Sequence, residues 1–186
     1  MKRILVCALA AVSLSAVDAR AQMSMGSFQG YLTGHVGLLD GPDLSERKLA
    51  GGAAVSVQEG NGWGAECDFG LSQDVRSGAQ VLDVSTYMVN GSWIKPRGVF
   101  RPFAIAGGGV MQVNGCDAPC NRAARTYDFG LTAGGGAYVA VTEIFGVRAD
   151  ARYFFSSADH PDLRRPENVA FWRVSIGATF MWAIAP

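Results

Sequence analysis

The stretch GVRADARYFF, residues 146–155, places a charged residue at every second position, with apolar residues between. A β-strand points alternate side chains to opposite faces, so Arg148, Asp150 and Arg152 share one face and the apolar residues share the other. A soluble sandwich buries the apolar face, whereas a membrane barrel turns it outward to lipid and keeps the charges inside. The rest of the chain decides between these arrangements.

Segments that alternate with a period of two recur along the chain, as the strands of an all-β protein do. They cover residues 28–38, 48–58, 63–72, 81–93, 100–113, 126–141, 146–155 and 170–182. The fourth loses its alternation after Thr86, which favours a bulge there. The fifth has a weak phase, although one face can hold Phe103, Ile105, Met111 and Val113.

The connections between these segments alternate in length. Short ones lie at 59–62, 95–98 and 142–143, and longer polar ones are centred on 40–47, 73–80, 114–125 and 156–168. Short periplasmic turns and longer external loops are typical of outer-membrane barrels. About ten residues tilted by about 45° also span close to the ~25 Å apolar band of such barrels. The sequence therefore predicts an all-β fold, an eight-stranded antiparallel up-and-down transmembrane β-barrel.

Aromatic residues gather at the strand ends, which predicts two girdles at the membrane interfaces. Near the periplasmic rim we expect Trp63, Trp93, Phe103, Phe145 and Trp182, and near the outer rim Tyr127, Tyr153 and Trp172.

The inward positions carry a near-balanced set of charges, which predicts a filled interior rather than a wide channel. The expected members are Glu66, Asp68, Asp83, Asp128, Arg148, Asp150, Arg152 and Arg173. Counting heights along the strands predicts two linked clusters. The first joins Glu66 and Asp68 to Arg148, and the second joins Asp128 and Asp150 to Arg152 and Arg173.

The first residues predict export. A charged start and an apolar run over 4–17 precede a small-x-small pattern at 19–21, so we expect a signal peptide over 1–21 and one barrel domain over 22–186. Cys116 and Cys120 lie in a polar loop, and in an oxidising compartment this spacing predicts a local disulfide. Two free thiols, or half of a metal site, are the alternatives.

The segment FRPFAIAGGGV, residues 100–110, combines a proline, aromatic residues and spaced glycines, and the last strand ends with Phe180, Met181 and Trp182. With these segments the mature chain resembles the small eight-stranded outer-membrane barrels of OmpA/OmpX type, the outer-membrane protein β-barrel domain. The resemblance covers essentially the whole mature chain and implies insertion by the barrel-assembly machinery. The chain departs from the family pattern by ending on Pro186 instead of an aromatic residue.

The resemblance implies a fold more firmly than a role. The leading hypothesis is a monomeric, non-enzymatic protein of the outer membrane that contacts lipid and lipopolysaccharide. It would act in envelope integrity or adhesion, with external loops such as 156–168 contacting a host or surface ligand. The net charge of zero gives no basic patch for nucleic acid, and no cofactor or metal is expected.

Two other functions remain open at this stage. Some eight-stranded barrels modify lipid A with a Ser–His–acid set, and this chain has His35, and His160 beside Ser156, Ser157 and Asp159. No family motif surrounds either histidine, which favours a structural role for both. A narrow small-solute pore between the inward charges is the second alternative, whereas a lipocalin-like soluble barrel is disfavoured because its interior would be apolar.

Overall fold

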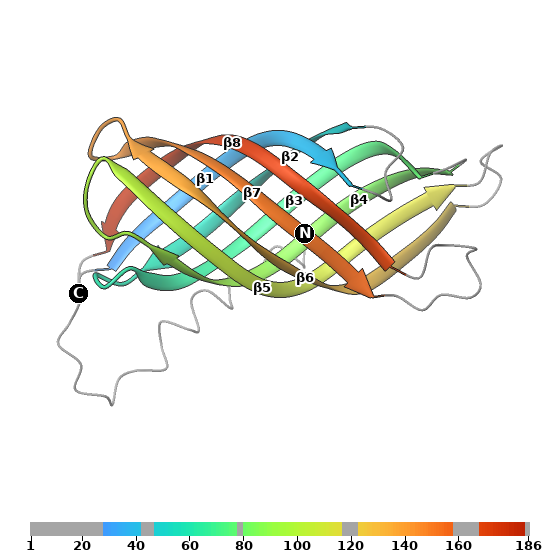
Figure 1. The fold of residues 1–186 in the computed structure, drawn as a ribbon, viewed down its shortest axis with the longest axis horizontal. Helices are drawn as coiled ribbons and strands as arrows, with labels where there is room; N and C mark the ends of the chain where they lie inside the picture. The colour runs from blue at the N-terminus through green and yellow to red at the C-terminus, as the bar shows by residue number, and fades with distance from the viewer. Residues whose placement is uncertain (1–27, 42–46, 78–79, 117–122, 158–167, 185–186) are drawn as a thin grey trace, which may run out of the picture.

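A computed structural model describes residues 28–41, 47–77, 80–116, 123–157 and 168–184. Within these ranges each strand pairs antiparallel with its sequence neighbours, and the first pairs with the last, so the sheet closes into an eight-stranded barrel (Figure 1). This confirms the predicted fold class. The expected signal peptide at 1–21 and Cys120 of the expected disulfide lie outside the described residues.

Each strand corresponds to one segment predicted from the alternation of the sequence. The strands are β1 (Phe28–Asp40), β2 (Lys48–Gln58), β3 (Trp63–Ser77), β4 (Gln80–Ile94), β5 (Phe100–Cys116), β6 (Ala123–Ala140), β7 (Phe145–Ser157) and β8 (Asn168–Ile184).

The barrel has two different ends. At one, here called the turn end, tight turns join β2 to β3, β4 to β5 and β6 to β7. Gly62 and Gly98 have φ angles of 94° and 105°, values that side chains other than glycine rarely accept. In the third turn, the backbone N–H of Phe145 donates to Thr142 Oγ1 at 3.0 Å. The opposite end, where the other connections leave the strands, is called the loop end.

Alternate residues of each strand face outward, and many of these are large and apolar. Val36 on β1 and Ile176 on β8 are paired neighbours, exposed by 58% and 57%. Further exposed residues of this belt are Leu32, Leu38, Leu49, Val55, Leu71, Val89, Val110, Leu131, Val139 and Val174. The outside of the barrel therefore offers apolar surface around its circumference, as a lipid environment requires.

The loop-end part of β4 differs from the expectation. Val84 is buried among apolar residues of the interior, and Asp83 is exposed. The prediction that Asp83 faces inward is therefore wrong. The bulge also lies elsewhere, because β4 keeps continuous register with both neighbours around Thr86, whereas the β3–β4 pairing shifts between Ser72 and Val75. This shift was not visible in the alternation of β3.

The interior is built in three layers along the barrel axis. A loop-end apolar layer consists of Leu39, Ala50, Val84, Met88, Met111, Val113, Phe154 and Phe171. A turn-end apolar layer consists of Tyr31, Ile94, Phe103, Ile105, Tyr138 and Met181. Charged and polar residues lie between them, as β8 shows with Phe171, then Arg173 and Ser175, then Met181. We call this middle part the ionic layer.

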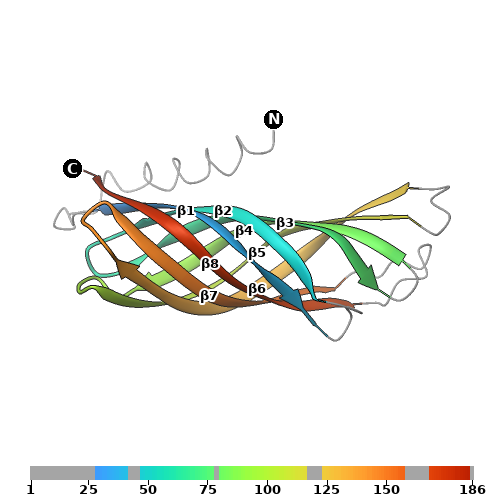
Figure 2. The same ribbon diagram turned by 90° about the horizontal axis from the view of Figure 1, so that it is seen from above.

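Strands β3, β4, β5 and β6 reach further than the others at the loop end. The pairing of β5 with β6 continues to Cys116 and Ala123, whereas β6 and β7 pair only as far as Gly130 and Ser156. Figures 1 and 2 show the yellow ends of β5 and β6 projecting beyond the ends of β1 and β8. The rim at the loop end is therefore uneven.

Candidate functional site

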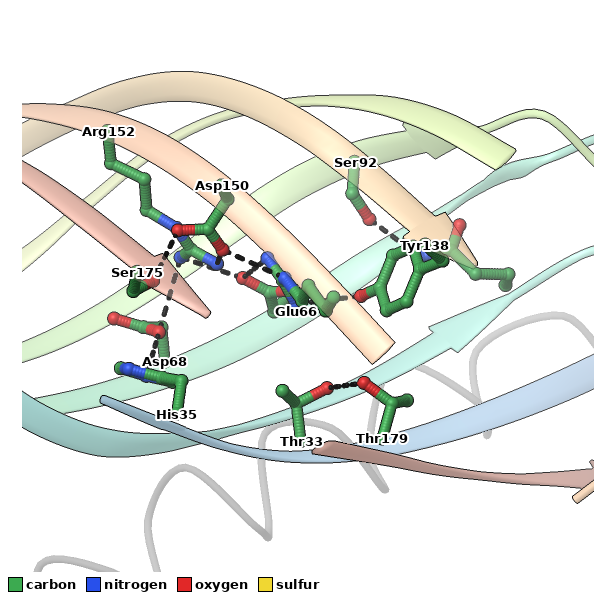
Figure 3. Close-up of polar contacts among 12 residues, drawn as sticks. Thr33, His35, Glu66, Asp68, Ser92, Tyr138, Asp150, Arg152, Ser175 and Thr179 are labelled. Atoms are coloured by element: carbon green, nitrogen blue, oxygen red, sulfur yellow. Dashed lines mark hydrogen bonds and ion pairs between the residues drawn. The ribbon is translucent and has the colours of Figure 1, made fainter. Parts of the chain in front are cut away.

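The ionic layer is formed by strands that are far apart in sequence. β3 contributes Glu66 and Asp68, and β7 contributes Arg148, Asp150 and Arg152. Arg173 and Ser175 come from β8, His35 from β1, and Tyr138, which also belongs to the turn-end apolar layer, from β6. Figure 3 shows the side chains of several of these residues converging inside the barrel. Strand alternation explains the placement, because each lies at an inward position of its strand.

Arg148 connects the two sides of the barrel. Its Nη1 lies 2.6 Å from Glu66 Oε2 and 2.7 Å from the Tyr138 hydroxyl, and its Nε donates to Asp150 Oδ2 at 2.8 Å. The guanidinium carbon also lies 4.4 Å from the centre of the Phe103 ring, within range of a cation–π interaction. Arg148 therefore links the ionic layer to the turn-end apolar layer.

Arg152 is fully buried and contacts every carboxylate of the cluster. Its Nη1 lies 2.9 Å from Glu66 Oε1 and 3.2 Å from Asp68 Oδ2, while Nη2 donates to Asp150 Oδ2 at 3.1 Å. Asp150 also accepts a hydrogen bond of 2.7 Å from Ser175. A buried arginine needs this number of partners, because an unpaired charge in the interior is costly.

Arg173 completes the cluster from β8. Its Nη2 donates to both oxygens of Asp68, at 2.8 Å and 2.9 Å. Asp68 also lies 3.3 Å from His35 Nε2. The Arg173 side chain can lie against β3 because Gly70 of that strand has no side chain. A Cβ built at Gly70 would lie 2.6 Å from Arg173 Nη1 and 2.6 Å from Thr86 Oγ1.

We expect Gly70→Ala to lower the free energy of unfolding by about 1–3 kcal/mol, because the methyl group displaces Arg173 from Asp68. Gly34→Ala is the matched control, since nothing lies within 4 Å of the Cβ built there, and its expected effect is within about 0.5 kcal/mol. Urea unfolding of the liposome-inserted protein measures both. Equal effects of the two variants would contradict the role given to Gly70.

The structure connects the ionic residues differently from the two clusters predicted. Arg148 meets Glu66, but it also meets Asp150, which was assigned to the other cluster. Arg173 pairs with Asp68 instead of Asp150. The three arginines and three carboxylates therefore form one connected network. Asp128 is buried nearer the loop end of β6.

Three neighbours of this network escaped the sequence reasoning. They are His35, Tyr138 and Ser175, none of which the sequence analysis assigns to the charge network. Their contacts depend on the reach of arginine side chains across the barrel, which alternation does not reveal. The sequence signal that could have identified them is the presence of uncharged polar residues at inward positions in the middle of these strands.

The ionic layer is covered on both sides by the apolar layers. At the loop end, Phe154 and Phe171 stack with ring centres 5.1 Å apart, and both are essentially unexposed. At the turn end, Tyr138 packs against Tyr31 and Phe103 at 5.2 Å and 5.0 Å. Beyond these rings, Arg101 donates to Gln29 Oε1 at 3.0 Å. The three arginines and three carboxylates of the network therefore lie between two layers of tightly packed side chains.

The exposed aromatic residues form a band near each end of the barrel. Trp63 pairs with Trp93 at the turn end, where Phe145 and the half-buried Trp182 also lie. Near the loop end, Tyr153 and Trp172 lie with ring centres 5.2 Å apart, and Tyr127 is exposed. Phe103 departs from the expected girdle, because it is buried inside. Their position at a membrane interface remains a prediction.

Only some of the residues considered for catalysis belong to the part of the chain that the structure describes. His160, Asp159 and the rest of 158–167 lie outside the described residues. Ser156 Oγ, which is described, donates to the backbone carbonyl of Phe129 at 3.3 Å. Within the described ranges no group of histidine, cysteine, aspartate and glutamate could hold a metal ion. Those ranges also hold no helix long and apolar enough to cross a membrane.

Comparison with known proteins identifies the fold. No protein-family model and no curated protein matches the chain. Among solved structures, Neisserial surface protein A superposes with a TM-score of 0.65 at 12% identity, over 82% of this chain and 96% of that one. The N-terminal β-barrel domain of Pseudomonas aeruginosa OprF gives 0.57 at 14% identity, over 86% and 100%.

Ail, the attachment invasion locus protein of Yersinia pestis, gives a TM-score of 0.56 at 16% identity, over 85% of this chain and 100% of Ail. At these identities the likeness concerns the fold alone. Together with the closed sheet, the exposed apolar belt and the buried ionic layer, it leads to one conclusion: the chain has the fold of the eight-stranded outer-membrane β-barrels.

Proposed function

We propose that this chain is a non-enzymatic outer-membrane protein whose closed barrel holds external segments for envelope integrity or surface interaction. The observation that carries the proposal is the layered interior inside an apolar exterior. The apolar belt suits a lipid environment, and the two apolar layers around the ionic network favour a rigid anchor over a conduit. In such a protein, the binding activity resides in the segments outside the membrane, which the rigid barrel holds in place.

The structural neighbours support a surface role only through their names and the ligand of one of them. One is named a surface protein, and Ail was solved with the heparin analogue sucrose octasulfate. A narrow pore is the second candidate in our proposal, because Arg and carboxylate side chains line the middle of the barrel. We place it second because a solute would have to pass both apolar layers, including the stacked rings of Phe154 and Phe171.

The test is thiol labelling on intact cells. In a background without the native cysteines, we introduce Arg47→Cys near the start of β2 or Asn61→Cys in the β2–β3 turn, both at exposed positions. An impermeant maleimide should label Arg47→Cys on intact cells and Asn61→Cys only after the outer membrane is permeabilised. These sites lie at opposite ends of the barrel, so each is the control for the other.

The proposal is excluded if neither site is labelled on intact cells. It is also excluded if only the Asn61→Cys site is labelled on intact cells. Two further readouts separate the alternatives. Stepwise ion conductance of the unmodified protein in a planar bilayer would favour the pore. An altered lipid A mass spectrum in cells that produce the protein would favour the enzyme.

A further inference from the structure

Three buried polar groups on one side of the interior have no hydrogen-bond partner among the described residues. They are the side-chain amide of Asn90 on β4, the hydroxyl of Thr132 on β6 and the Nε of Arg152 on β7. The exposed fractions of these residues are 1%, 4% and 0%. Buried polar groups are almost always hydrogen-bonded, because burying one without a partner costs free energy. These groups therefore need a partner from outside the polypeptide.

The three groups lie at adjoining positions of the barrel wall. Asn90 and Thr132 are the register partners of Gly107 on its two sides, so they flank this glycine across three neighbouring strands. Their backbones are two strand spacings apart, about 10 Å, with no side chain between them. Arg152 pairs with Gly134, the next inward position of β6 after Thr132. The sheet therefore gathers all three groups around two glycines.

The two glycines leave room for the polar groups. A Cβ built at Gly107 would lie 2.6 Å from Asn90 Oδ1, and one built at Gly134 would lie 3.1 Å from Arg152 Cγ. The amide of Asn90 therefore lies over Gly107, and the aliphatic part of Arg152 lies over Gly134. We call Gly107 and Gly134 the glycine floor of the site.

The chemistry of the three groups selects a neutral partner that both donates and accepts hydrogen bonds. The Nε–H of Arg152 can only donate, whereas the Asn90 amide and the Thr132 hydroxyl can do both. An anion would leave the amide oxygen of Asn90 unpaired and would lie beside the carboxylates of the ionic network. A cation would face the charge of Arg152. Water meets the requirement, since a buried water molecule usually makes about three hydrogen bonds to polar groups of the protein.

We propose that Asn90, Thr132 and Arg152 bind water over the glycine floor. The water accepts a hydrogen bond from Arg152 Nε and donates to the oxygens of Asn90 and Thr132. This completes the partners of Arg152, whose Nη1 and Nη2 face the carboxylates. Because an apolar layer covers each side of the ionic layer, this water exchanges slowly with the solvent. The inference concerns the interior alone and does not depend on the proposed function.

The first test replaces Thr132 with valine, which keeps the shape of the side chain and removes the hydroxyl. With water bound, a hydrogen bond is lost, and the urea midpoint of the liposome-inserted protein should fall by about 0.3–0.5 M. Thr33→Val is the matched control, because Thr33 Oγ1 lies 2.9 Å from a protein partner, Thr179 Oγ1. Its midpoint should fall at least as much. An unchanged or higher midpoint for Thr132→Val overturns the proposal, because removing a hydroxyl that has no partner relieves an unfavourable burial.

The second test observes the water by NMR in lipid nanodiscs. The side-chain amide of Asn90 is labelled with nitrogen-15 and assigned by its loss in Asn90→Ser. We expect a nuclear Overhauser cross-peak from this amide to the water resonance that changes sign in the rotating frame, which distinguishes long-lived bound water from proton exchange. The side-chain amide of Asn61, exposed in the β2–β3 turn and bonded to Glu59, is the control and should contact only short-lived surface water.

Two results of these measurements overturn the proposal. One is an Asn90 amide without a contact to water. The other is an unfolding midpoint that moves when chloride is replaced by gluconate, or sodium by choline, in the unmodified protein but not in Thr132→Val, since an ion would then occupy the site.

Discussion

Replacing Arg148 with methionine is expected to lower the free energy of unfolding by about 3–5 kcal/mol, because it removes one partner of a buried ion pair. The 2.6 Å contact with Glu66 and the 2.8 Å contact with Asp150 are both lost. Methionine keeps much of the packing against the turn-end apolar layer, so the loss reports mainly on charge. Urea unfolding in liposomes gives the value.

Two further variants make this result specific. Arg148→Met with Glu66→Gln removes one charge of each sign, so part of the stability should return. Arg47→Ala also breaks a 2.8 Å ion pair with Asp40, but that pair is exposed to solvent, and its loss should cost no more than about 1 kcal/mol. Strict additivity of the two interior changes would show that Arg148 and Glu66 do not interact.

Placing a charge on the outer belt should be nearly as damaging. Ile176 lies near the middle of β8 with its side chain outward, beside Val36 and Ala149 on the neighbouring strands. We expect Ile176→Arg to destabilise the liposome-inserted barrel by about 2–4 kcal/mol, as an arginine near the bilayer midplane does. The same urea titration measures this change.

The control for the belt is a second apolar residue at the turn end. Ile144 is exposed to a similar degree but lies in the β6–β7 turn, so Ile144→Arg should cost only about 0–1 kcal/mol, as expected near an interface. A soluble barrel would tolerate arginine equally at both positions. Similar small effects of the two changes would therefore exclude a lipid-facing belt.

The strands and their order could be predicted from the sequence because alternation and loop length are local features. In GVRADARYFF, charge and apolar character alternate without interruption, and Arg148, Asp150 and Arg152 all lie inside. The loop-end part of β4 and most of β5 lack such contrast, since apolar residues occupy both faces. Val84 and Phe103 turn inward to fill the two ends of a narrow interior, and only packing against other strands determines this.

The ion-pair partners inside the barrel could not be predicted by counting residue positions along the strands. Strand tilt and stagger displace neighbouring strands along the axis, so equal positions in sequence differ in height. Arginine side chains then reach across several strands, as Arg173 does when it passes Gly70 to meet Asp68. The six charged residues of the network could therefore be predicted from the sequence, although Asp83 was wrongly added to them, whereas their connections required the closed barrel.

The sequence separation of the ionic partners has a consequence for the order of folding. Glu66 lies 82 residues before Arg148, and Asp68 lies 105 residues before Arg173. A sheet that lacks β7 and β8 thus carries two carboxylates on β3 without the arginines that neutralise them. Entry of such a sheet into lipid is opposed by the uncompensated charge, while contacts this distant form slowly. We therefore expect charge neutralisation and closure by the last two strands to occur together, late in folding, so that incomplete barrels stay out of the bilayer.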